Sequence, residues 1–170
     1  MEYHKYLPFH HIEKWNGKYF ATTTLFDQGH VIHLGHNGNA CPGIAETDSW
    51  MNVNETMEGL DEDIYSNIYE SNENFNLSGT YGEIVVVHTT GVFNHRVQWC
   101  KCPNAPDKAT QLFQLQLFPA SLQNPKTAFT FNCLDYFYMD AMECKTSASS
   151  FISKLQRLTN NAFPQKISVS

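Results

Sequence analysis

Residues 83–102 read EIVVVHTTGVFNHRVQWCKC. The run EIVVVHTT is centred on apolar, β-branched residues and predicts a buried strand, while GVFN predicts a turn and HRVQWCKC a second strand. The two strands would form a hairpin that ends at Cys100 and Cys102, just before the Pro-containing loop PNAPDKAT. The hairpin therefore carries two thiols to one end of the predicted sheet.

Flanking segments extend this sheet. The stretch VIHL (31–34) predicts a short strand that leads directly to His36. On the other side, QLFQLQLF (111–118) alternates apolar and polar residues, which predicts a third strand that stops at Pro119. If VIHL pairs with the hairpin, the segments around His36 and the Cys pair converge.

After Pro125 the pattern becomes helical, and residues 124–163 predict a helical hairpin. The first helix would bury a stripe made of Phe129, Leu134, Phe137, Tyr138 and Met142. The second would start at the caps Thr146 and Ser147 and bury Phe151, Leu155 and Leu158. The expected class is α+β: a small antiparallel sheet from the segments near 30, 84–102 and 111–118, pinned at one edge by zinc and followed by a two-helix layer.

Charge is unevenly distributed along the chain. Residues 46–83 contain ten Asp or Glu and no Lys or Arg, so the remainder carries 7 acids against 11 bases, a net charge of +4. The segment 46–82 is an acidic, low-complexity insert with too little apolar surface to offset the entropy of ordering, and we expect it to be disordered. The mildly basic remainder permits contact with nucleic acid without demonstrating it.

Length and hydropathy favour one domain covering residues 1–170, in a soluble intracellular protein. No apolar run approaches the roughly 20 residues that a membrane span needs. The five cysteines are an odd number, which argues against a disulfide framework. The aromatic residues Trp15, Tyr19, Phe20 and Trp99 could stack on bases, but we expect them to fill the core.

Two short clusters of soft ligands suggest a zinc site. His36 precedes Cys41 by five residues, and His95 precedes Cys100 and Cys102 at a similar spacing. Zinc is bound tetrahedrally by thiolate and imidazole groups in structural sites. The alternative is that the cysteines are small buried hydrophobic residues of a reduced protein.

The motifs also resemble a known family. The segments PFHHIEKWNGKYF, LGHNGNACP, GVFNHRVQWCKC, QLFQLQLFPAS, NPKTAFTFNCLDYF and ECKTSASSFISKLQRLTNNAFP occur in this order. Together they closely resemble the CxC-type cysteine-cluster domain found beside Kyakuja-Dileera-Zisupton (KDZ) transposases, which is abundant in mushroom-forming fungi. The resemblance covers nearly the whole chain outside the acidic insert.

The resemblance implies a non-catalytic zinc-binding module that recognises DNA or organises the transposase catalytic domain, in an intracellular and nuclear setting. It implies His36, Cys41, Cys100 and Cys102 as zinc ligands. The family commonly has a histidine where this chain has Phe93, and His95 is the candidate substitute. His4 and His10 match the closing histidine pair of a zinc finger that precedes this domain in the family. The resemblance leaves two expectations for the chain, an accessory module of a transposase or a degenerate transposon fragment.

Other functions remain open from the sequence. A protein-interaction scaffold without metal would need none of the proposed ligands. A cysteine hydrolase would use Cys100 or Cys102 as nucleophile with His95 or His88 as base, but no nucleophile motif accompanies the Cys pair. We therefore expect that the chain is not an enzyme.

Overall fold

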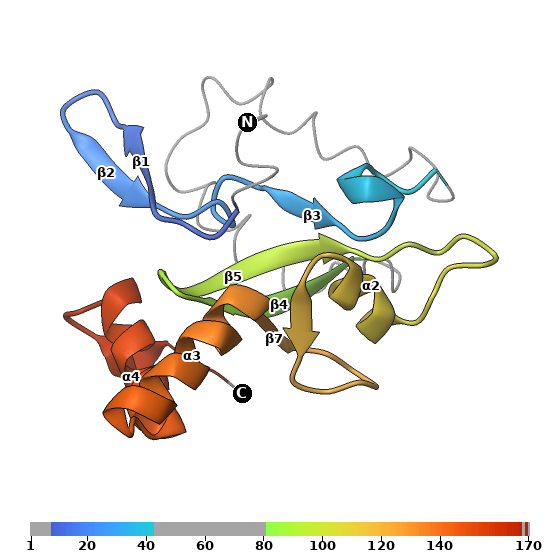
Figure 1. The fold of residues 1–170 in the computed structure, drawn as a ribbon. Helices are drawn as coiled ribbons and strands as arrows, with labels where there is room; N and C mark the ends of the chain where they lie inside the picture. The colour runs from blue at the N-terminus through green and yellow to red at the C-terminus, as the bar shows by residue number, and fades with distance from the viewer. Residues whose placement is uncertain (1–7, 43–80, 168, 170) are drawn as a thin grey trace.

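The computed structural model describes residues 8–42, 81–167 and 169. His4 and residues 46–80 of the acidic insert therefore lie outside the described residues, whereas Tyr81 and Gly82, predicted to belong to the insert, begin β4. The chain forms two sheets and three α-helices within the described residues, shown in Figure 1. In chain order the elements are β1 (Ile12–Trp15), β2 (Phe20–Thr23), β3 (Val31–His33), η2 (His36–Gly38), β4 (Tyr81–His88), β5 (Gly91–Gln98), α2 (Lys108–Gln114), β6 (Leu117–Pro119), β7 (Thr127–Thr130), α3 (Phe131–Cys144), α4 (Ala148–Thr159) and η6 (Pro164–Lys166).

The main sheet has the strand order β3-β5-β4-β7-β6. The predicted hairpin is present, since β4 and β5 pair antiparallel from Tyr81 opposite Gln98 to His88 opposite Gly91. Its turn, predicted at GVFN, lies instead at Thr89 and Thr90, so residues 91–94 belong to β5, which ends at Gln98. β3 pairs with β5 in parallel, and β4 pairs with β7 in parallel, so this sheet is mixed rather than wholly antiparallel. The α+β class is confirmed, and the pairing of VIHL with the hairpin, on which the metal hypothesis depended, is present.

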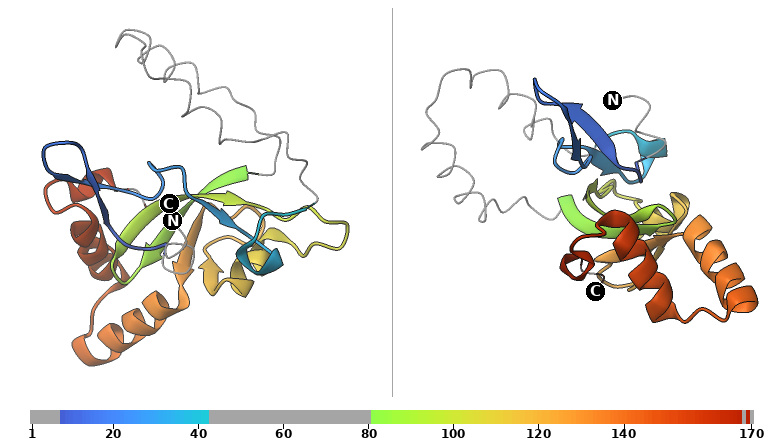
Figure 2. Two further views of the ribbon diagram at one scale, coloured as in Figure 1. Left: turned by 90° about the horizontal axis from the view of Figure 1, so that it is seen from above. Right: turned by 90° about the vertical axis from the view of Figure 1, so that its left-hand side faces the viewer.

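Both faces of the main sheet are covered, as the continuous apolar run in β4 requires. Alternate residues of β4 point to opposite faces. Ile84 and Val86 join a cluster with Trp99, Leu112 and Leu117, while Val87 joins the cluster that contains Phe151 and Leu155. Figure 2 shows α3 and α4 on one side of the sheet and the β1–β2 hairpin beyond its edge strand β3.

The predicted third strand over residues 111–118 is wrong for most of its length. Residues 108–114 form α2, and only Leu117–Pro119 forms the edge strand β6. Asp107 caps α2, because its side chain accepts a hydrogen bond from the backbone N–H of Thr110. This cap and the burial of Leu112 against the sheet favour the helix over the alternating pattern.

The helical layer begins later than predicted. Residues 127–130 form β7, so Phe129 lies on a strand, and α3 starts at Phe131 with Thr130 as its cap. Tyr138 and Met142 are 63% and 54% exposed, which contradicts their place in the predicted core stripe. The buried residue of α3 is instead Cys133.

The second helix agrees more closely with its prediction. Ser147 caps α4 by accepting from the N–H of Ser150, and Phe151 and Leu155 are buried. Leu158 is 54% exposed, so its predicted burial is wrong. Helices α3 and α4 contact one another through the rings of Phe137 and Phe151.

The aromatic residues divide into two groups. Trp99 is buried, with its ring beside Gly82, where a Cβ would come within 2.8 Å of the indole nitrogen. Trp15, Tyr19 and Phe20 are 55%, 61% and 64% exposed on the β1–β2 hairpin, so the expectation that they fill the core is wrong. The alternation of residues in these two strands does not show which face of a two-stranded sheet is exposed.

Candidate metal centre

Four side chains from two distant segments meet at one end of the main sheet. His36, Cys41, Cys100 and Cys102 offer one potential ligand atom each, and these atoms all lie within 4.8 Å of one another. Sγ of Cys41 lies 3.7 Å from Sγ of Cys100 and 3.6 Å from Sγ of Cys102. Nε2 of His36 lies 3.2 Å and 3.4 Å from the sulfurs of Cys100 and Cys102.

These separations fit the coordination sphere of a zinc ion. A tetrahedron with zinc–sulfur bonds of roughly 2.3 Å places its sulfurs about 3.8 Å apart, and a nitrogen bound at about 2.0 Å lies roughly 3.5 Å from each sulfur. The observed separations fall within a few tenths of an ångström of those values. They are far longer than the roughly 2.05 Å of a disulfide bond, so the geometry is that of thiols or thiolates around a common centre.

The parallel pairing of β3 with β5 brings the two segments together. In the register, His33 lies opposite Gln98, so both strands end at the same edge of the sheet. The chain continues from β3 into η2, which begins at His36, and from β5 to Cys100. The next residue in this extension, Leu34, still donates its N–H to the carbonyl of Gln98 at 2.9 Å.

Gly35 allows the two backbones to approach closely. Its φ is +85°, and a Cβ at this position would lie 3.0 Å from Cβ of Cys100 and 3.6 Å from its sulfur. Any larger residue would be strained by its conformation and would push against Cys100. The Gly-His pair of LGHNGNACP therefore has a physical role in placing His36 over the thiols.

The backbone of Cys100 is held by a side chain that the sequence reasoning missed. Gln111, on α2, is 2% exposed. Its Oε1 accepts a hydrogen bond from the N–H of Cys100 at 2.9 Å, and its Nε2 donates to the carbonyls of Cys100 and Pro106 at 3.2 and 2.8 Å. The D-x-x-T capping pattern of Asp107 and Thr110 is the sequence signal that could have revealed this helix and its inward-facing glutamine.

The chain matches the family described as "CxC2 like cysteine cluster associated with KDZ transposases" over residues 69–163, more than half of its 170 residues. The chain belongs to this family. No curated protein and no solved structure gave a significant match. The matched segment of the CxC2 domain contains Cys100 and Cys102, whereas His36 and Cys41 lie before it and join the cluster through the fold.

The neighbours of Cys102 hold its thiol in the protonated form when no metal is bound. The hydrogen bond with Cys41, followed by the one with Cys100, raises the pKa of Cys102 to about 11. A metal ion reverses this preference, since it binds the thiolate and displaces the proton. The cluster is thus suited to binding a cation rather than to supplying a free thiolate.

His95 is not brought to the cluster. It lies on β5 opposite Ile84, on the same face of the strand as Phe93, and its ring contacts Phe9 with centroids 5.3 Å apart. Five residues of extended strand separate it from Cys100 by roughly 16 Å, which is too far for a shared ion. Phe93, at the position of the family histidine, is also buried away from the four side chains.

Instead, His95 is a buried histidine of the sheet. It is 1% exposed, and neither ring nitrogen has a hydrogen-bond partner among the described residues. Burial lowers the pKa of His95 to about 4, with a smaller contribution from the nearby charge of His30. His95 is therefore neutral at pH 7, and its protonation opposes folding.

Replacing His95 with leucine is expected to raise the free energy of unfolding at pH 7 by about 1–2 kcal/mol, because the variant removes unsatisfied buried polar atoms. The unfolded chain binds a proton near the ordinary pKa of 6.5, whereas the folded chain does so near 4. Folded wild-type protein should therefore lose about 2 kcal/mol between pH 7 and pH 5, a loss that the variant lacks. Urea titrations of both proteins at the two pH values measure this difference, and parallel pH profiles would contradict it.

Proposed function

We propose that this chain is a non-catalytic, zinc-stabilised accessory module of a KDZ transposase, whose role is to bind DNA or the transposase catalytic domain. The observation that carries the proposal is the convergence of His36, Cys41, Cys100 and Cys102 within 4.8 Å in a CxC2 domain. Zinc is the metal best suited to three thiolates and one imidazole in a tetrahedral arrangement. When bound, it would supply a permanent cross-link between the ends of β3 and β5.

The ligand set supports a structural role for the metal. Four protein ligands complete a tetrahedron and leave no open position for water or substrate, which a catalytic zinc requires. Cys41 and Cys100 are buried, Cys102 is half-buried and His36 is exposed, so the ion would be partly covered by the fold. A closed site of this kind stabilises the surrounding backbone and acts on partners only through the surfaces that it holds in place.

A cysteine hydrolase is less well supported. A nucleophilic cysteine needs a lowered pKa, whereas the neighbouring thiols raise the pKa of Cys102. The candidate base His88 bonds to Thr130 through Nδ1, at 2.9 Å, and His95 is held in the apolar interior. The raised thiol pKa and the position of His95 both favour the binding module.

The setting of the module follows from the family association. A partner of a DNA transposase acts where the DNA lies, and the proposal therefore includes a nuclear location. Within the described residues no helix is long and apolar enough to span a membrane.

A protein-interaction scaffold that works without metal is the second candidate function. Metal analysis separates this scaffold from the zinc-stabilised module.

The test is the metal content of the full chain purified without chelators. We expect about one equivalent of zinc per chain, in line with a single four-ligand site. Elemental analysis by mass spectrometry, with iron, copper and nickel measured in the same sample, identifies the ion. A chain that folds with no bound metal after zinc supplementation would exclude the zinc-stabilised module and leave the scaffold.

A further inference from the structure

The β1–β2 hairpin places its largest apolar side chains in solvent. Trp15, Tyr19 and Phe20 are each more than half exposed, although the main sheet has cores on both faces that could bury such residues. Clustered exposed aromatic residues on a soluble domain mark a binding surface more often than isolated ones do. We call Trp15, Tyr19 and Phe20 the aromatic tip.

The register of the hairpin shows that the exposure is systematic. Trp15 lies directly opposite Phe20, and their ring centroids are 5.1 Å apart at an interplanar angle of 56°. On the other face of the ribbon, Ile12, Ala21 and Thr23 are half-buried, while Lys14 is exposed. The aromatic pair therefore lies on the more exposed face of the hairpin, together with Glu13 and Thr22.

The aromatic tip is held in a fixed conformation. Oδ1 of Asn16 accepts hydrogen bonds from the N–H groups of Lys18 and Tyr19, both at 3.0 Å, and Gly17 has a φ of +94° that this turn requires. A surface ordered before binding loses little conformational entropy when a ligand arrives.

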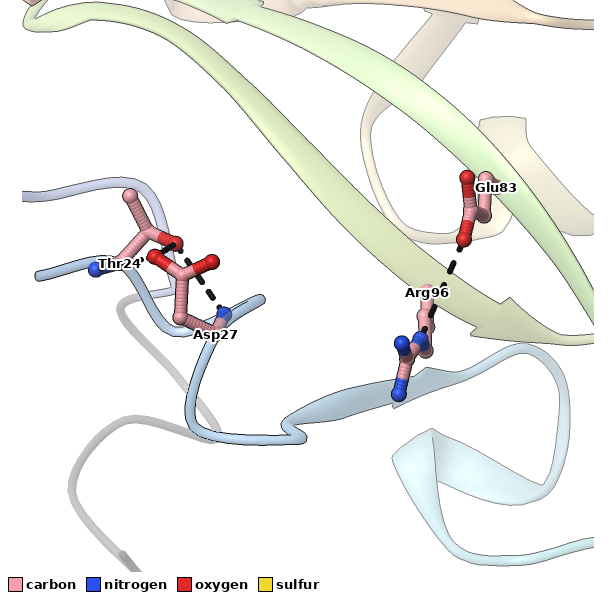
Figure 3. A network of polar contacts seen from close by, with 4 residues as sticks. All are labelled: Thr24, Asp27, Glu83 and Arg96. Atoms are coloured by element: carbon pink, nitrogen blue, oxygen red, sulfur yellow. Dashed lines mark hydrogen bonds and ion pairs between the residues drawn. The ribbon is translucent and has the colours of Figure 1, made fainter. Parts of the chain in front are cut away.

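The base of the hairpin is anchored to the main sheet through the loop that follows β2. Figure 3 shows Thr24 and Asp27 closing this loop: Oδ2 of Asp27 accepts from the hydroxyl of Thr24 at 2.6 Å. The guanidinium of Arg96, on β5, lies 4.9 Å from the ring centroid of Phe26 in the same loop and 4.0 Å from Glu83. The hairpin is therefore an arm with a fixed base and an exposed end (Figure 1).

Charge is mixed around the aromatic tip. Lys18, in the turn beside Tyr19, is exposed, whereas Glu13 lies on the same face of the ribbon as Trp15 and Phe20, and Lys14 lies on the opposite face. The full chain has a net charge of −6, because residues 46–83 hold ten of its 17 acids, and the remainder carries +4, which permits contact with a polyanion. Exposed aromatic rings combined with lysines form the usual surface for single-stranded nucleic acid, in which bases stack on the rings and lysines neutralise phosphates.

We propose that the aromatic tip is a stacking platform for the unpaired bases of single-stranded DNA, with Lys18 on a phosphate. The proposal rests on the proposed function, because it assigns the DNA contact of the accessory module to one surface. Duplex DNA offers no free base faces to such a platform, so single strands or melted ends are the expected ligand.

The experiment measures the binding of the full, zinc-loaded chain to a fluorescein-labelled oligothymidylate of about 12 nucleotides, a length within the usual site sizes for single strands. The double variant W15A/F20A should bind roughly 5- to 150-fold more weakly, which is the effect of losing one stacked base. The variant W15F/F20Y keeps both rings and should retain most of the affinity. Tyr138→Ala removes an aromatic residue of equal exposure on α3 and should change nothing.

Lys18 has a separate signature. K18Q should lower the slope of log affinity against log salt by about 0.7, the value for one phosphate contact on a single strand, whereas K14Q, on the opposite face of the ribbon, should leave the slope unchanged. Tighter binding to duplex than to single strand, or equal binding by W15A/F20A and wild type, would overturn the proposal. So would a concentration-dependent dimer that W15A/F20A dissociates, since the aromatic tip would then bind a second copy.

Metal content distinguishes this proposal from the one before it. The substitutions in W15A/F20A are on the β1–β2 hairpin and remove none of the four candidate ligands. The variant should therefore keep its zinc and its melting temperature. A chain with one zinc that does not bind single-stranded DNA at low salt would refute the stacking platform and leave the metal module intact. A folded chain without zinc would refute the module itself.

Discussion

Replacing Cys100 with serine is expected to lower the zinc content well below one equivalent and to destabilise the fold by about 3–5 kcal/mol, roughly a third of the apparent free energy of a structural zinc site. For a chain of this size the melting temperature should fall by about 10 °C or more. Cys100 is chosen because it is buried and its backbone is fixed by Gln111, so the position cannot relax when the ligand is lost. Elemental analysis and circular dichroism measure the two effects.

A matched control uses the cysteine outside the cluster. Cys144→Ser changes an exposed thiol at the end of α3 and should leave zinc content and melting temperature unchanged. Adding a strong chelator to the wild type should reproduce the loss seen in C100S, and the same chelator should have little further effect on C100S itself. A C100S chain that retains one zinc and the wild-type melting temperature would show that the metal is bound elsewhere.

Replacing Leu155 with alanine is expected to destabilise the chain by about 3–4 kcal/mol. Leu155 is fully buried on α4, in the cluster with Val87, Val92, Cys133 and Phe151. Truncation would leave a cavity between α4 and the sheet, because the surrounding strand residues are fixed by their hydrogen bonds and cannot close it. Urea unfolding monitored by circular dichroism gives the free energy.

Leu158 provides the control for this substitution on the same helix. It is 54% exposed, and Leu158→Ala makes the same chemical change with almost the same helix propensity. We expect its effect to stay within about 0.5 kcal/mol. Equal destabilisation by L155A and L158A would mean that α4 packs on the sheet through a different face from the one described.

The sequence predicted the parts of the fold in which local pattern and tertiary environment agree. The apolar run of β4 and the serine cap of α4 each have one dominant interpretation, and each is present. The turn between β4 and β5 was predicted at GVFN, but the two residues before Gly91 form it. The stretch QLFQLQLF fits a strand by alternation and a helix by spacing. Its structure depended on two things. The Asp107 cap is visible in the local sequence, whereas the fit of Leu112 and Gln111 beneath the Cys pair is not.

For the candidate site, the chemistry of the residues was predictable and their placement was not. Thiols and imidazoles in two short clusters indicated a metal, and the structure brings four of the five candidates together. His95 was a candidate because its spacing from Cys100 resembled that of His36 from Cys41. Spacing alone does not reveal that one pair lies along an extended strand while the other is folded back by a glycine turn.

The separation of the four candidate ligands along the chain has a consequence for biosynthesis. His36 and Cys41 leave the ribosome first, and Cys100 follows Cys41 by 59 residues. A nascent chain with only the first pair can hold zinc weakly, so tight capture must wait until Cys102 has been translated. On the proposed zinc binding, tight loading of the ion would therefore be a late event in the synthesis of the chain.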